Sequence, residues 1–272
     1  MEKNHSFLTK RPFAHRGYHS RSLNDLKPVP ENSLEAFRLA IEENYSIEMD
    51  IQLTKDLKII VFHDFFLGRL TTKTGFVFSK NLKCIREARL SNNERVPTLE
   101  EALNLIEGSV PLLLEIKYSK LIKENLGIFT KVLAEKLKTY NGPVALMSFS
   151  FDLMKYIRKS NLFRRFPLGL TTSFQTNETL ANKIKNNKIE NEIVSNNLKF
   201  ISQDWKGIKN MRIKCKPGLI PPFYYDMPNT FEEIMKSEQK YLKSYFKNPI
   251  KTDVKYFFGA IKNILFGGAR SS

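Results

Sequence analysis

Three carboxylates in the sequence have the spacing of ligands for a metal ion. Glu48 and Asp50 are two residues apart in the apolar run 46–54, so strand alternation places both on one face. Glu115 lies near the end of a second apolar run, 110–117. Carboxylates that are buried together repel each other unless a cation neutralises them, and Mg²⁺ and Ca²⁺ prefer such oxygen ligands. We therefore expect these three residues to bind a divalent metal ion, Mg²⁺ or Ca²⁺.

Exposed strand faces are the alternative explanation for these carboxylates. On such faces the acidic side chains would simply point into water. The residues between and beside them are large and apolar, which favours buried strands instead: Ile47, Met49, Ile51, Leu112, Leu114 and Ile116.

Two of the four histidines end apolar runs and could transfer protons. His15 follows a short run, and Gly17 permits a sharp exit from that strand. His63 ends the run 58–64, which a predicted tight turn joins to the Asp50 strand. If that hairpin is centred near residue 56 or 57, His63 lies opposite Asp50. Two imidazoles beside a metal can act as general base and general acid on opposite sides of a phosphorus centre. The other two histidines are expected at the surface: His5 and His19.

Two cationic side chains adjoin this expected site. Arg16 follows His15, and Lys117 shares a strand face with Glu115. A guanidinium fork and an ammonium point charge both suit the non-bridging oxygens of a phosphate. The sequence contains no Gly-rich phosphate-binding loop, which argues against nucleotide-dependent phosphoryl transfer.

The elements that must position these residues alternate between strands and helices. Strands are predicted at 12–17, 46–54, 58–64, 110–117, 143–149, 167–172 and 198–204. Helices are predicted at 34–44, 98–107, 121–139 and 151–160 and near 177–190, the first of them capped by Ser33. This alternation predicts βα units and a parallel sheet, and in a barrel of such units the functional residues lie at the C-terminal strand ends. The segment 65–97 is longer than a usual connection and is predicted to form a small insertion over those ends.

Length and composition fit one α/β domain over 1–272. No internal repeat or low-complexity linker divides the chain. No stretch approaches the roughly 20 apolar residues of a membrane-spanning helix, and the N-terminus lacks the apolar segment of a secretory signal. The two cysteines, Cys84 and Cys215, have no metal-binding spacing, so a reducing cytoplasm is expected.

A formal net charge of +16 has two explanations. One is a general bias toward lysine in this chain. The other is attraction to anions, either phosphodiesters or an anionic membrane surface. Nucleic acid is the weakest candidate partner and is not expected, because no recognition motif accompanies the charge.

Seven motifs, taken in order, resemble those of the glycerophosphodiester phosphodiesterase family. They are FAHRG at 13–17, PENSLEAF at 30–37, EMDIQLTKD at 48–56, VFHD at 61–64, LGRLTT at 67–72, VPTLEE at 96–101 and LLEIK at 113–117. Their order and spacing fit the family over residues 12–170 and more weakly to about residue 204.

The resemblance implies a TIM-type (β/α)8 barrel whose 65–97 insertion is the family's small subdomain. It implies hydrolysis of a small glycerophosphodiester to glycerol 3-phosphate and an alcohol, through attack of the glycerol 2-hydroxyl on phosphorus and a cyclic phosphate that water opens. It also implies roles for particular residues: metal ligation by Glu48, Asp50 and Glu115, acid–base catalysis by His15 and His63, and a supporting or substrate-contacting role for Glu31 and Asn32.

The C-terminal part, 205–272, departs from the family pattern. Its late motifs are missing, so only six barrel strands are predicted by residue 204 and the last two are divergent or absent. Something in 205–272 must then close the barrel, because open strand edges are prone to aggregation. The tail 251–266 has an apolar helical face with lysines elsewhere. It is expected to be an outer helix of the barrel or a basic helix on the anionic inner face of a membrane.

Two other functions stay open at this point. A lysophospholipase D acting at a membrane would use the same chemistry on a lipid substrate. A catalytically degenerate barrel would bind a phosphodiester without hydrolysing it. The sequence makes no prediction of oligomeric state.

Overall fold

The structure is a computed structural model that describes residues 7–10, 13–19, 29–172, 191, 196, 198–203, 223–226 and 255–258. Its strands are β1 (Phe13–Ala14), β2 (Ser46–Leu53), β3 (Ile59–Val61), β4 (Leu112–Ile116), β5 (Val144–Ser148), β6 (Leu168–Thr172), β7 (Phe200–Gln203), β8 (Phe223–Asp226) and β9 (Lys255–Phe258). Its α-helices are α1 (Phe7–Lys10), α2 (Leu34–Glu42), α3 (Leu82–Arg86), α4 (Leu99–Ile106), α5 (Lys120–Glu124), α6 (Leu126–Lys138) and α7 (Phe151–Lys159). Three 3₁₀ turns complete the described elements: η1 (Leu67–Arg69), η2 (Val77–Ser79) and η3 (Asn161–Phe163).

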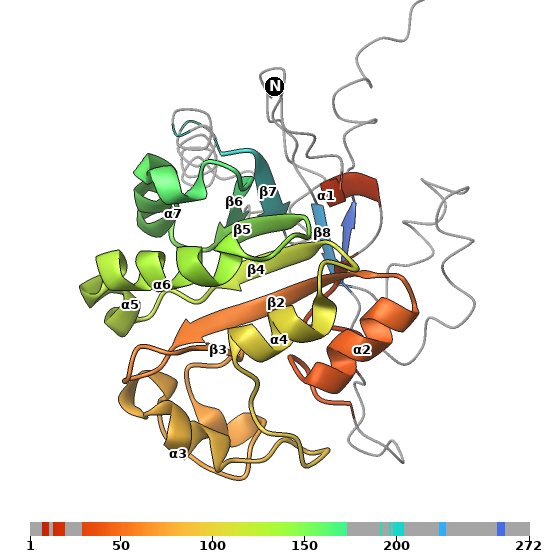
Figure 1. Cartoon of the computed structure of the whole chain (residues 1–272), viewed down its shortest axis with the longest axis vertical. Helices are drawn as coiled ribbons and strands as arrows, with labels where there is room; N and C mark the ends of the chain where they lie inside the picture. Colours follow the sequence, from red (N-terminus) through yellow and green to blue (C-terminus); the bar gives the residue numbers. More distant parts are fainter. Residues whose placement is uncertain are drawn as a thin grey trace, which may run out of the picture.

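Six strands form the predicted parallel sheet, in the order β1-β2-β4-β5-β6-β7, and β3 pairs antiparallel with β2. Figure 1 shows β2, β4, β5, β6 and β7 side by side, with helices α2, α4, α6 and α7 packed along them. The register makes Asp50 of β2 the direct partner of Glu115 of β4. This pairing brings the two predicted metal ligands together at the C-terminal ends of their strands.

The strands separate two apolar cores, because successive side chains point to opposite faces. The outward residues Ile47, Met49 and Ile51 of β2 belong to a large cluster that includes apolar residues of the surrounding helices. The inward residues form a smaller cluster: Leu8, Phe13, Leu113, Ala145, Met147 and Phe200. The inward positions of β2 are instead acidic or amide: Glu48, Asp50 and Gln52. The barrel interior is therefore apolar in one part and polar at the candidate site.

Strands β8 and β9 lie where the parallel series would otherwise end. They pair antiparallel with each other, and β8 contacts β7 while β9 contacts β1. The six parallel strands agree with the number predicted by residue 204. The last two strands are thus divergent rather than absent, and the pair stands between the two edges of the parallel sheet.

The predicted helix over 251–266 is wrong where the structure describes it. Residues 255–258 form strand β9 instead, paired with 223–226. Both segments are rich in aromatic residues, which favour the pleated surface of a sheet over the helix that the spacing suggested. The rest of the tail, Trp205, Cys215 and the predicted helix near 177–190 lie outside the described residues.

The β2–β3 hairpin forms as predicted, but its register differs by one residue. Leu57, in the connection 54–58 between the strands, adopts a positive φ of 60°, and its N–H donates to the carbonyl of Thr54 at 2.9 Å. The backbone N–H of Phe62 donates to the carbonyl of Asp50 at 2.9 Å. Phe62, and not His63, therefore lies opposite Asp50, and His63 follows the end of β3.

The segment 65–97 is the predicted insertion and has its own small apolar core. It contains η1, η2 and α3. Its buried cluster consists of Ile60, Phe62, Leu67, Val77, Ile85, Leu90 and Val96. Among the described helices, none is long and apolar enough to cross a membrane.

Gly169 of β6 tests the packing of the barrel interior. A Cβ on this residue would overlap the ring of Phe200 on the neighbouring strand. We expect Gly169→Ala to lower the free energy of unfolding by about 1–3 kcal/mol, because a packed core does not accept an added methyl group. Urea denaturation of the purified protein measures this loss.

Two further variants make that measurement specific. Gly127→Ala in α6 is the matched control, because its Cβ would lie 3.8 Å from its nearest neighbour, the hydroxyl of Tyr156. The double variant Gly169→Ala/Phe200→Leu should regain part of the lost stability. If Gly169→Ala were as stable as Gly127→Ala, the tight interior packing would be contradicted.

Candidate active site

Three acidic side chains converge at the C-terminal ends of β2 and β4. One carboxylate oxygen from each of Glu48, Asp50 and Glu115 lies within 4.8 Å of the other two. All three residues are buried. Strand alternation correctly predicted that Glu48 and Asp50 share a face, and the β2–β4 register adds Glu115. Metal ligation by the three residues stays a prediction.

Burial and mutual repulsion shift the pKa values of these acids. Burial, reinforced by the charges of Asp50 and Glu115, raises the pKa of Glu48 well above its usual range. Burial also raises the pKa of Glu115, against the opposing effect of Lys117. Burial acts in the same direction on Asp50, but Lys117 and Arg16 together hold its pKa far below the usual range. The two neighbouring cations, Lys117 and Arg16, therefore stabilise mainly the ionised form of Asp50.

Lys117 connects two of the three carboxylates. Its Nζ lies 2.9 Å from Oδ1 of Asp50 and forms an ion pair with Glu115. These two charges raise the pKa of Lys117 against the effect of burial. The ammonium thus remains charged and supplies one of the cations that the cluster requires.

The donor set fits a hard divalent ion. Oε1 of Glu48 is buried and accepts no hydrogen bond from the residues that the structure describes. A buried carboxylate oxygen without a donor is costly, and a bound cation would remove that cost. Carboxylates from Glu48, Asp50 and Glu115 are ligands that suit both Mg²⁺ and Ca²⁺.

The turn after β1 aims a backbone amide at Glu48. Arg16 and Gly17 both have positive φ, 58° and 80°. This geometry lets the N–H of Arg16 donate to Oε2 of Glu48 at 2.8 Å, while Nε2 of His15 lies 3.9 Å from the same oxygen. A Cβ on Gly17 would come within 2.8 Å of Ala36 in α2, so only glycine fits this close contact. His15 is thereby placed beside the carboxylate cluster.

Asn32 and Glu31 reach the site from the loop before α2. Asn32, at φ 56°, donates from its side chain to Oδ2 of Asp50 at 2.8 Å and accepts from the backbone N–H of Asp50 at 3.2 Å. Glu31 accepts a hydrogen bond of 2.7 Å from the Arg16 guanidinium. Ser33 caps α2 as predicted, by accepting from the N–H of Ala36. The substrate contact predicted for Glu31 and Asn32 stays untested, whereas their contacts within the protein are clear.

His63 is held by its neighbour Asp64. Nδ1 of His63 lies 2.6 Å from Oδ1 of Asp64, which leaves Nε2 as the proton acceptor of the neutral ring. Burial lowers the pKa of His63, and the charges of Lys117 and Arg16 add to this, although Asp50 and Asp64 oppose them. A neutral imidazole of this kind is suited to accept a proton.

Arg69 also belongs to the site, although its role was not predicted from the sequence. Arg69 of η1 donates to both oxygens of Asp64, at 2.5 and 2.9 Å, and to both oxygens of Glu31, at 3.0 and 2.7 Å. It therefore joins the carboxylate that holds His63 to the one that holds the guanidinium of Arg16. The only signal in the sequence was its place in the matching motif at 67–72.

His19 is buried and not at the surface as predicted. Only 4% of it is exposed. The N–H of His19 donates to the carbonyl of Gly17 at 3.1 Å, and the N–H of the preceding Tyr18 donates to the carbonyl of Ala36 in α2 at 2.8 Å. His5 lies outside the described residues.

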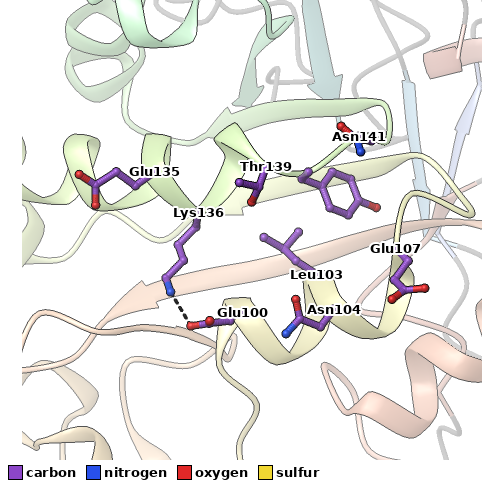
Figure 2. Close-up of a pocket in the computed structure, with 9 residues that line it drawn as sticks. Glu100, Leu103, Asn104, Glu107, Glu135, Lys136, Thr139 and Asn141 are labelled. Carbon is purple, nitrogen blue, oxygen red and sulfur yellow. Dashed lines mark hydrogen bonds and ion pairs between the residues drawn. The ribbon is translucent and has the colours of Figure 1, made fainter.

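A groove on the outer side of the barrel is separate from this site. It has a volume of about 560 Å³ and lies between α4 and α6 (Figure 2). An ion pair between Lys136 and Glu100 crosses it. Its lining includes none of the residues discussed above: Glu100, Leu103, Asn104, Glu107, Glu135, Lys136, Thr139, Tyr140 and Asn141.

The fold and the site together define an α/β barrel with a carboxylate and histidine centre at its C-terminal strand ends. Residues 15–214 match the glycerophosphoryl diester phosphodiesterase family, and the chain belongs to this family.

Relatives and solved structures agree with this assignment. The chain is 35% identical over 156 residues to a glycerophosphodiester phosphodiesterase of Caldanaerobacter subterraneus, covering 54% of this chain and 60% of that protein. It is 38% identical over 97 residues to the putative glycerophosphodiester phosphodiesterase YhdW of Bacillus subtilis, covering 33% and 40%. The matched segments thus span less than two thirds of either relative.

The solved structures establish the barrel fold. An Oleispira antarctica phosphodiesterase, solved with the product sn-glycerol-3-phosphate, has a TM-score of 0.64 at 19% identity, covering 93% of this chain and 94% of that one. A glycerophosphodiester phosphodiesterase of Thermotoga maritima has a TM-score of 0.59 at 20% identity, covering 84% and 89%. At these identities the likeness concerns the fold alone.

Thermal unfolding with and without metal tests the carboxylate cluster. We expect Mg²⁺ or Ca²⁺ at about one hundred times its Kd to raise the Tm of the native protein by roughly 5–10 °C relative to chelator. Glu48→Gln should remove this shift. Without metal the same variant should be at least as stable as the native protein, because it removes a buried charge that its neighbours repel.

Exposed Glu100 provides the control, and Glu100→Gln should keep the full metal shift. An unchanged shift in Glu48→Gln would show that the ion binds elsewhere.

Proposed function

We propose that the protein hydrolyses glycerophosphodiesters to glycerol 3-phosphate and an alcohol with the help of a divalent metal ion. The observation that carries this proposal is the cluster of three buried carboxylates with Nε2 of His15 at 3.9 Å from Glu48. The second imidazole, His63, acts electrostatically on the same cluster, where it helps to lower the pKa of Asp50. Family membership and the names of the relatives support the substrate class. A small-molecule phosphodiester is therefore the proposed partner of the site.

The metal site is proposed at Glu48, Asp50 and Glu115. A bound Mg²⁺ or Ca²⁺ supplies electrostatic stabilisation to the charged phosphate oxygens. Asn32 supports this site indirectly, because its two hydrogen bonds to Asp50 fix the orientation of that carboxylate.

Two histidines on the same site account for the proton transfers. In the first step, one imidazole takes the proton of the glycerol 2-hydroxyl, whose oxygen attacks phosphorus. The bond from phosphorus to the alcohol breaks, and the alcohol takes a proton from the other imidazole. Water then opens the cyclic phosphate, with the proton transfers reversed. The lowered pKa of His63 suits it to begin as the base.

Arg16 and Lys117 are the proposed phosphate contacts. Each already adjoins Asp50, with Nε of Arg16 at 3.4 Å and Nζ of Lys117 at 2.9 Å from its oxygens. Both are partly buried, so their charges act in a medium where electrostatic interactions are stronger than in water. They can stabilise the charge that develops on the non-bridging oxygens.

Release of glycerol 3-phosphate from glycerophosphocholine tests the proposed reaction. We expect activity with Mg²⁺ or Ca²⁺, none with chelator, and a fall in kcat of roughly 10²–10⁴-fold in His15→Ala, because a proton transfer is lost. Lys136→Met, in the groove of Figure 2, is the control that should keep native activity. Activity that survives both chelator and His15→Ala would contradict the mechanism. Metal binding without turnover of any diester would favour the degenerate binding barrel.

A lysophospholipase D activity is the second candidate function. Phe149 follows β5, is 63% exposed and lies with its ring centre 5.9 Å from Nζ of Lys117. An exposed aromatic ring beside the proposed phosphate contact favours a substrate with an apolar portion. Rates on glycerophosphocholine and on lysophosphatidylcholine vesicles separate the two candidates.

The predicted membrane contact of 251–266 assumed that this segment is an amphipathic helix. Four of those residues form β9 and not a helix. Deleting 251–272 and measuring vesicle binding tests what remains of that prediction. A cytoplasmic location also stays a prediction, made from the use of cysteine.

Arg69 is proposed as a positioning residue. It joins Asp64, which holds His63, to Glu31, which holds the guanidinium of Arg16. Arg69→Leu should lower kcat by roughly 10–100-fold with little change in KM or metal affinity, because it releases Asp64 and Glu31 without removing a ligand. Arg69→Lys should recover only a small part of kcat, since an ammonium cannot bridge two carboxylates as a guanidinium fork does. Steady-state kinetics measure this. A variant that raised KM alone would place Arg69 among the substrate contacts instead.

A further inference from the structure

Three phenylalanines of the insertion form an aromatic row, in which Phe66 and Phe76 are exposed and Phe78 is half-buried. An isolated antiparallel bridge aligns Phe66 with Phe76, and their rings meet edge to face with centres 5.4 Å apart. The ring of Phe78 stacks on that of Phe76 at 5.2 Å. Phe66 is 43% exposed and Phe76 is 49% exposed. We call these three residues the aromatic row.

The core of the insertion does not account for this row. Val77 lies between Phe76 and Phe78 in the chain and is fully buried in the small core of the insertion. The two rings on either side of it lie together outside that core. An exposed group of large apolar side chains of this kind marks a surface that meets another apolar phase.

Positive charge is in excess in the segment that contains the aromatic row. The segment 65–97 contains seven Lys and Arg residues and only two Glu. Lys80 folds over Gly75, directly before Phe76, and Lys73 and Lys83 are nearby in the chain. Arg69, Lys73 and Arg86 are each paired with a carboxylate. The excess charge therefore comes mainly from the remaining basic residues: Lys80, Lys83, Arg89 and Arg95. Aromatic rings beside lysines are complementary to an interface that is apolar inside and anionic at its surface.

The row also lies close to the candidate active site along the chain. Phe66 is two residues after Asp64, the partner of His63, and directly precedes η1, which contains Arg69. Arg69 is bonded to Asp64 and to Glu31. A surface that contacts the aromatic row would therefore be near the mouth of the site.

We propose that the aromatic row docks the protein on an anionic phospholipid bilayer. The rings of Phe66, Phe76 and Phe78 enter the boundary between headgroups and acyl chains, and the neighbouring lysines contact anionic headgroups. The two contributions are separable, because the rings supply apolar burial and the lysines supply a salt-dependent attraction. This binding does not require turnover, so it can fail or succeed independently of the proposed hydrolysis.

Sedimentation with vesicles tests the docking. The full chain should bind vesicles of phosphatidylcholine with phosphatidylglycerol, bind phosphatidylcholine alone far more weakly, and dissociate as salt is raised. Phe66→Ser/Phe76→Ser should weaken binding to the mixed vesicles by about tenfold or more, because two buried rings are lost. Lys80→Glu/Lys83→Glu should lower binding to the mixed vesicles and leave the weak binding to phosphatidylcholine unchanged.

A control of similar exposure keeps this test specific. Ile128 and Leu162 are 46% and 52% exposed on α6 and η3, away from the insertion. Ile128→Ser/Leu162→Ser should bind mixed vesicles as the native chain does. Circular dichroism and metal-free Tm show that each variant is folded, and activity on soluble glycerophosphocholine should be unchanged in the aromatic-row variant.

Three outcomes would overturn the proposal. The first is native protein that does not bind anionic vesicles. The second is an aromatic-row variant that binds these vesicles as well as the control variant does. A native dimer that the aromatic-row substitutions convert to a monomer, measured by light scattering, would show that a second copy of the chain covers the row.

Discussion

Repulsion among three buried carboxylates is the constraint on which the mouth of this barrel depends. The β2–β4 register places Asp50 directly beside Glu115, and strand alternation adds Glu48 on the same face. Folding such a group without compensation would cost several kcal/mol for each charge. Lys117 and Arg16 offset part of this cost at Asp50, whereas Glu48 is left with the weakest compensation. A divalent ion is the simplest way to complete the balance.

The loops around the cluster are shaped by the same constraint. Arg16 and Asn32 are non-glycine residues with positive φ, a conformation that persists only where surrounding contacts fix it. In both cases the contact is a carboxylate: Arg16 donates its N–H to Glu48, and Asn32 holds Asp50 with two hydrogen bonds. The loops and the acidic strands therefore stabilise one another. A substitution in either should alter the conformation of both.

Local periodicity predicted the parts of this structure that depend on one strand or one helix. Examples are the shared face of Glu48 and Asp50 and the cap that Ser33 places on α2. The failures concern features that periodicity does not contain. The hairpin slipped by one residue because Leu57 enters the left-handed region, and no pattern marks a leucine for that conformation. Arg69 was missed because its partner Glu31 is 38 residues away, across the fold of the insertion.

The insertion connects an exposed surface of the molecule to the candidate active site through a short piece of chain. Residues 63–69 contain the imidazole of His63, the carboxylate that holds it, an exposed ring and the guanidinium of Arg69. Four hydrogen bonds from Arg69 fix this piece to Asp64 and, across the barrel mouth, to Glu31. Phe66 and His63 thus belong to one short segment of the chain. The exposed face of the insertion therefore lies beside the candidate site, while the side chain of Phe66 itself is exposed.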